Sequence, residues 1–147
     1  MRKRMLSVSL LLATVTLVVF AGGQAKSTNT APALTGTWQA LEAELGGKAL
    51  PAETARSIKL NLSATEYQVG NDFGTIEIDP TATLAAMTIR GTKGPNQGKT
   101  ILAIYELSGD TLRICYDLTG QKHPTAFATA AGTRLFLVRY KKEESKQ

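Results

Sequence analysis

Side chains that could support catalysis are few in this 147-residue chain, and they form no recognisable catalytic group. His123 is the only histidine, which excludes a histidine cluster for metal and makes any Ser-His-Asp arrangement depend on one loop residue. The acids are scattered, with no pair at a spacing typical of glycosidases. No spacing along the sequence brings Lys99 or Asp117 close to His123, so only the tertiary fold could do so. We therefore expect no catalytic site, no metal site and no cofactor, and a protein that is not an enzyme.

Two other features have both a chemical and a structural interpretation. Residues 94–100 (GPNQGKT) are similar to a phosphate-binding loop, but only three residues separate Gly94 from Gly98. Such loops have four residues there and continue into a helix, whereas a strand follows here, so we interpret this segment as a turn. The single Cys115 cannot form an internal disulfide. We interpret it as a small hydrophobe on a strand, in preference to a reactive or intermolecular thiol.

Residues 1–25 have the pattern of a secretory signal peptide. A basic start (RKR) precedes an apolar run over residues 5–20, and small residues permit cleavage after Ala25 or after Gly23. An uncleaved membrane anchor is the alternative, and it would be the only link to a membrane. We expect an exported protein, located in the periplasm, in the cell envelope or outside the cell.

Most of the positive charge belongs to this N-terminal segment. Its removal lowers the net charge from +5 to +2, because it takes away three of the 17 Lys and Arg and none of the 12 acids. The remaining basic residues alternate with acids and form no stripe. Nucleic acid is therefore not expected as a partner.

The rest of the chain is predicted to form a linker over residues 26–33, one domain over residues 34–141 and a polar tail over residues 142–147. One short helix is expected over residues 49–56, where Pro51 occupies an early position. Alternating apolar residues between turn signals predict about eight strands. Their ranges are 36–45, 57–62, 66–70, 73–79, 84–91, two within 100–116, and 134–140. This spacing is typical of a sandwich or an up-and-down barrel, and the short connections favour an antiparallel, all-β barrel.

The clearest element is a β-hairpin over residues 100–116. With Ser108 and Gly109 as the central turn residues, Tyr105 would face Leu112. One face is then wholly apolar and points to the core; it consists of Ile101, Ala103, Tyr105, Leu112, Ile114 and Tyr116. On the outer face Leu102 and Ile104 stand beside Cys115, so we expect something to cover them, either a second copy of the chain or the segment 49–56.

Several residue strings resemble a planctomycete-type family of uncharacterised exported domains grouped with lipocalin-like barrels. The resemblance covers residues 34–140 and rests on the strings at 36–38 (GTW), 47–53 (GKALPAE), 94–100 (GPNQGKT), 104–112 (IYELSGDTL), Cys115 and 124–127 (PTAF). His123 stands where the family leads us to expect arginine. The resemblance implies a lipocalin-like barrel and an exported setting, and it implies no reaction.

The string at 36–38 also resembles the start of lipocalins, in which a tryptophan closes the barrel floor against an arginine of the last strand. This resemblance implies that Trp38 is a structural plug and that Arg139 or Arg134 makes a cation–π contact with it.

Two functions follow from this description. The first is an exported lipocalin-like protein that binds a small apolar or amphipathic ligand inside the barrel. Its candidate pocket residues are Trp38, Tyr105, Leu112, Ile114 and Tyr116. The alternative is a protein-interaction or inhibitor module of the envelope, whose outer face of Leu102, Ile104 and Cys115 would contact a protein partner or form a homodimer.

Overall fold

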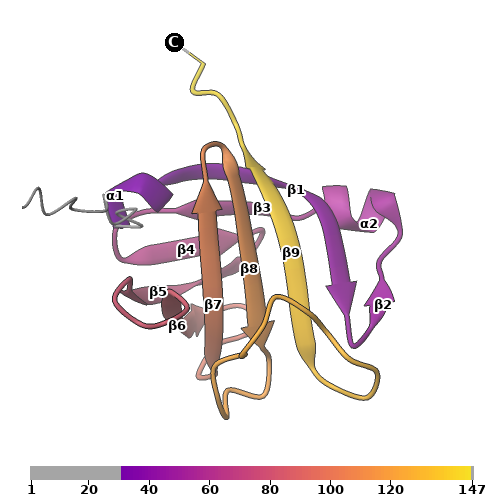
Figure 1. Ribbon diagram of the computed structural model, residues 1–147. Helices are drawn as coiled ribbons and strands as arrows, with labels where there is room; N and C mark the ends of the chain where they lie inside the picture. The colour runs from indigo at the N-terminus through magenta and orange to yellow at the C-terminus, as the bar shows by residue number, and fades with distance from the viewer. Residues whose placement is uncertain (1–30, 147) are drawn as a thin grey trace, which may run out of the picture.

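The computed structural model describes residues 31–146 of the chain, which form two short helices and nine strands (Figure 1). The expected signal segment 1–25 lies outside these residues. Among residues 31–146 there is no helix of the length and apolarity needed to cross a membrane. The elements are α1 (Ala31–Leu34), β1 (Gly36–Leu45), β2 (Lys48–Ala49), α2 (Ala52–Arg56), β3 (Lys59–Leu62), β4 (Glu66–Val69), β5 (Asp72–Asp79), β6 (Ala86–Lys93), β7 (Thr100–Ser108), β8 (Thr111–Asp117) and β9 (Leu135–Lys142).

Eight of the strands close into an antiparallel barrel. From β3 to β9 each strand pairs with the next in the chain, and β1 pairs with both β3 and β9, which closes the ring. The two-residue β2 pairs only with the last two residues of β1, Glu44 and Leu45. This confirms the predicted all-β, up-and-down barrel and its short helix α2. The strands from β3 to β9 lie within two residues of their expected bounds.

β1 is a strand although its Ala, Leu and Glu content suits a helix. It ends at Gly46 and Gly47, whose φ angles of 54° and 79° form a tight turn that other residues adopt with strain. The register shifts between Ala40 and Glu42 where β1 pairs with β9, which is a β-bulge. β1 pairs with β9 on both sides of this bulge, from Trp38 to Leu45.

The hairpin of β7 and β8 has the predicted faces but a different turn. Ser108 pairs with Thr111, so Gly109 and Asp110 are the central residues, and Tyr105 faces Ile114 where Leu112 was expected. Gly109 has a φ of 59°, which explains why the turn centres one residue later. The pairing shifts by two residues, and side chains alternate with a period of two, so the predicted inner face is unchanged.

Two separate apolar layers lie on the two sides of β7 and β8. The barrel core contains the inward side chains of all eight strands, together with Leu34 and Ala55 of the two helices. Ile104 and Cys115 are 2% and 0% exposed but do not belong to this core. They lie under residues 118–134, the connection between β8 and β9, which we call the strap. Figure 1 shows the strap, in orange, crossing in front of the lower parts of β8 and β9.

The barrel is plugged at the end where β1 begins and β9 finishes. Leu34 and Trp38 are both 0% exposed there, and Trp38 Nε1 donates a hydrogen bond to the Leu34 carbonyl at 2.8 Å. Lys142 Nζ lies 5.3 Å from the centre of the Trp38 ring. α1 therefore belongs to the folded domain, although residues 31–33 were expected in the linker. Lys142 was expected in the tail but is the last residue of β9.

Candidate functional site

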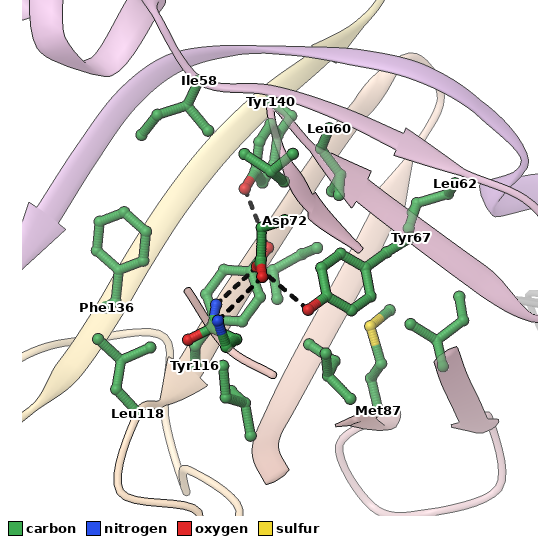
Figure 2. Close-up of a pocket in the computed structure, with 16 residues that line it drawn as sticks. Ile58, Leu60, Leu62, Tyr67, Asp72, Met87, Tyr116, Leu118, Phe136 and Tyr140 are labelled. Atoms are coloured by element: carbon green, nitrogen blue, oxygen red, sulfur yellow. Dashed lines mark hydrogen bonds between the residues drawn. The ribbon is translucent and has the colours of Figure 1, made fainter. Parts of the chain in front are cut away.

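The barrel contains a cavity of about 200 Å³ that is partly open to solvent (Figure 2). Strands β3 to β9 and the β6–β7 loop contribute to its wall, whereas β1 does not. Apolar cavities of about 150 Å³ hold benzene, so this volume suits one small ring or a short alkyl chain. The lining residues are Ile58, Leu60, Leu62, Tyr67, Val69, Asp72, Ile76, Met87, Ile89, Asn96, Ile101, Ile114, Tyr116, Leu118, Phe136 and Tyr140.

The apolar wall follows from strand alternation. β3 presents Leu60 and Leu62 to the interior, and β6 presents Met87 and Ile89, while the residues between them are less buried. Gly74 of β5 makes room for one wall residue, since a Cβ there would lie 2.5 Å from the Tyr67 ring and 2.1 Å from a backbone oxygen of β6. The Tyr67 side chain of β4 can therefore lie over Gly74 of β5, next to β6.

A buried carboxylate lies at the rim of this wall. Asp72 is 8% exposed and accepts three hydrogen bonds: from the Tyr67 hydroxyl at 3.2 Å, from the Asn96 backbone N–H at 3.1 Å and from Asn96 Nδ2 at 2.7 Å. Figure 2 shows Asp72 at the centre of these contacts. Burial, together with the charge of Asp72 and the hydrogen bond to it, raises the pKa of Tyr67 to about 12. Tyr67 therefore stays a neutral donor at physiological pH.

The β6–β7 loop is held closely against the β4–β5 turn at this rim. Gly94 has a φ of 88°, and a Cβ on it would lie 2.3 Å from the Asn71 carbonyl oxygen. Only glycine permits this approach. The sequence GPNQGKT therefore forms a turn, as predicted, and this turn brings Asn96 to Asp72.

A pair of tyrosines supplies a second polar point in the cavity wall. The hydroxyls of Tyr116 and Tyr140 are 3.0 Å apart, and the Tyr116 ring stacks on Phe136 with centroids 5.9 Å apart. Burial raises the pKa of both phenols above the usual range, so neither ionises at neutral pH. Since the two hydroxyls share one hydrogen bond, one proton of the pair is available to a further acceptor.

The structure divides the five predicted pocket residues between two regions. Ile114 and Tyr116 line the cavity. Trp38, Tyr105 and Leu112 do not line it, and each is at most 1% exposed in the barrel core.

Sequence reasoning missed the polar residues of the site. Asp72 resembles the acids that end many strands, and Asn96 lies in a polar loop, so turn formation accounts for both in the sequence. The inward positions of β3 to β6 are visible in the alternation. The contact between Asp72 and Asn96, which are 24 residues apart, is not visible in the sequence.

The cation at the barrel floor is Lys142, which corrects the expectation of Arg139 or Arg134. Arg139 points outward and pairs with Glu42 at 2.8 Å, which lowers the pKa of Glu42. Arg134 precedes β9 and is exposed. Alternation along β9 places Lys142 on the face of Tyr140, the inner one, and Arg139 on the other.

The candidate partner face is covered by the chain itself. The strap, and not the expected segment 49–56, contacts it. Phe127 lies 4.3 Å from the Arg113 guanidinium, and the Cys115 thiol is 3.7 Å from the Ala128 carbonyl. Leu102 is half-buried, while Ile104 is buried. Burial raises the pKa of Cys115 and keeps it a thiol.

Asp117 holds the start of the strap. It is 6% exposed and accepts hydrogen bonds from Thr119 and from the backbone N–H groups of Gln121 and Lys122. These hydrogen bonds lower its pKa although burial alone would raise it. In residues 31–146, His123 Nε2 is buried without a hydrogen-bond partner, and no group of three His, Cys, Asp or Glu is placed to hold a metal.

Comparison of the chain with protein-family models, with curated proteins and with solved structures found no match. The resemblance to the planctomycete-type family and to the start of lipocalins therefore stays a prediction from the residues.

Proposed function

We propose that this chain is an exported, lipocalin-like protein that binds one small apolar or amphipathic molecule inside its barrel. The observation that carries the proposal is the cavity of about 200 Å³ with apolar walls and a few convergent polar groups. An eight-stranded barrel is just wide enough to be filled by side chains or to hold one small ligand. The space left between β3 and β9 favours the second possibility.

The outer apolar face gives less support to the alternative of a protein-interaction module. Ile104 and Cys115 are already covered by the strap, so a partner would have to displace it. The interior cavity requires no such rearrangement.

The test uses the isoleucine methyl groups as internal reporters. Five isoleucines line the cavity, whereas Ile104 lies under the strap, outside the barrel core. The purified chain with labelled isoleucine methyl groups is titrated with benzyl alcohol and followed by NMR. We expect saturable shifts for Ile76, Ile89 and Ile114 and none for Ile104.

A cavity-filling variant supplies the control. Ile114→Phe places a ring in the cavity and should abolish the shifts of Ile76 and Ile89. Ile104→Val removes one methylene group from the layer under the strap and should leave binding unchanged. Shifts that do not saturate, or that persist in Ile114→Phe, would contradict the proposal. Mass spectrometry of the native protein then identifies any small molecule that co-purifies.

A further inference from the structure

The carboxylate of Asp72 faces the cavity without a cation beside it. In residues 31–146 no Lys, Arg or His nitrogen lies within 4.0 Å of an Asp72 oxygen, whereas five acids elsewhere in this part of the chain form such ion pairs. Each of those five acids is on the surface, where a salt bridge contributes little. Among residues 31–146 two acids are buried, Asp72 and Asp117, and neither has such an ion pair. Only Asp72 lines the cavity, where a bound cation could pair with it, and a buried charge is costly unless it is paired.

The hydrogen bonds to Asp72 leave room for another donor. Oδ2 accepts from the Tyr67 hydroxyl and from Asn96 Nδ2, whereas Oδ1 accepts, among the described residues, only from the Asn96 backbone N–H. A carboxylate has about four acceptor positions, so one remains at Oδ1. Both donor residues line the same cavity as Asp72, which places the carboxylate within reach of a bound molecule.

The surroundings also suit a positive charge. Three tyrosines and Phe136 line the cavity together with Asp72, and the faces of such rings attract ammonium groups. Apart from Asn96, the rest of the wall is apolar and would bury an apolar body of about the size of one ring.

We propose that the ligand is a small amphiphilic amine, whose ammonium group pairs with Asp72 and whose apolar body fills the space between β3 and β9. This inference rests on the proposed function and adds the chemical class of the ligand. Asp72 also fastens the β6–β7 loop through Asn96. That role accounts for the two hydrogen bonds from Asn96 and leaves the charge of the carboxylate unbalanced.

The test compares three probes of one shape and different charge. Benzylamine, benzyl alcohol and benzoate are titrated into the purified chain at about pH 7, with the isoleucine methyl shifts as the readout. We expect benzylamine to bind about tenfold more tightly than benzyl alcohol, as one charge-assisted hydrogen bond implies, and benzoate to bind weakest.

Asp72→Asn removes the charge and keeps the shape of the side chain. It should bring the affinity for benzylamine close to that for benzyl alcohol, so that the preference for the amine disappears. Asp117→Asn is the matched control, because Asp117 is also buried and also fastens a loop but does not line the cavity. This variant should retain the preference for the amine.

The outcomes separate the two proposals. If benzyl alcohol binds the unmodified chain as tightly as benzylamine, the amine is overturned while the ligand-binding function stands. If none of the three probes gives saturable shifts, the function itself fails. If Asp72→Asn does not fold, the order of affinities in the unmodified chain and their salt dependence decide between the two outcomes. Raising the salt concentration from about 0.05 M to about 0.5 M should weaken the binding of benzylamine and leave that of benzyl alcohol unchanged.

Discussion

At the scale of single residues, this barrel places polar atoms in an otherwise apolar interior and satisfies them in pairs. The Tyr67 hydroxyl donates to Asp72, and the hydroxyls of Tyr116 and Tyr140 contact each other. Removing one partner of a buried pair leaves the other without a hydrogen bond, which costs more than removing both. These pairs fix where the cavity is polar.

This reasoning predicts the outcome of a double-mutant cycle. Tyr116→Phe and Tyr140→Phe should each lower the free energy of unfolding by about 1 to 2 kcal/mol, because each leaves a buried hydroxyl unpaired. The double variant should lose less than the sum, with a coupling of about 1 kcal/mol. Urea unfolding of the four proteins measures this. Strictly additive losses would mean that the two hydroxyls do not depend on each other.

At the scale of elements, the strap makes the outer face of β7 and β8 a second buried layer. Asp117 holds the start of the strap. In the middle of the strap, Phe127 and Ala128 contact the outer face of β8. Near the end of the strap, the Thr129 hydroxyl contacts Glu44 and accepts a hydrogen bond from the Gly47 backbone N–H at 2.8 Å. The apolar outer residues that suggest an intermolecular contact in the sequence are thus covered within one chain.

Loosening the strap should expose Cys115. Phe127→Ala removes the half-buried ring over Arg113 and should lower the free energy of unfolding by about 1 to 2 kcal/mol. The rate at which a thiol reagent labels Cys115 in the folded protein should rise, since the thiol is 0% exposed under the strap. Thr125→Ala, an exposed position of the same segment, is the control and should label slowly. Equal rates in the two variants would show that Phe127 does not hold the cover.

At the scale of the whole molecule, the barrel buries or half-buries every tyrosine of the chain. Burial raises the pKa of all four, to about 12 for Tyr67 and Tyr105 and further for Tyr116 and Tyr140. In the unfolded chain tyrosine titrates near 10. Above that pH the unfolded chain releases protons that the folded barrel retains, so stability is full below about pH 10 and falls as pH rises.

The expected loss is up to about 1.4 kcal/mol per pH unit for each tyrosine that stays protonated in the barrel. Urea unfolding at about pH 9, 10 and 11 measures it, and Tyr67→Phe should make the decline shallower. Cys115 acts in the same direction because its pKa is also raised. Phenolate absorbance should appear only as the protein unfolds. Its appearance in the folded protein near pH 10 would contradict the prediction.

The sequence by itself determined the barrel, its strands and the two faces of the β7–β8 hairpin. These depend on alternation and turn residues, which act over a few positions, so even a turn displaced by one residue left the inner face intact. The same local signals identified two of the residues that line the cavity, Ile114 and Tyr116, which are inward residues of one hairpin.

Only the tertiary structure decided where the interior stays empty and which charges meet. Whether an inward ring lines the cavity depends on side chains from strands distant in sequence, which is why Tyr67 and Tyr140 line it while Trp38 and Tyr105 do not. The contact of Asp72 with Asn96, the strap over Cys115 and the choice of Lys142 in place of Arg139 depend on the same three-dimensional placement. Closure of the barrel brings these residues together, and no spacing along the chain encodes their contacts.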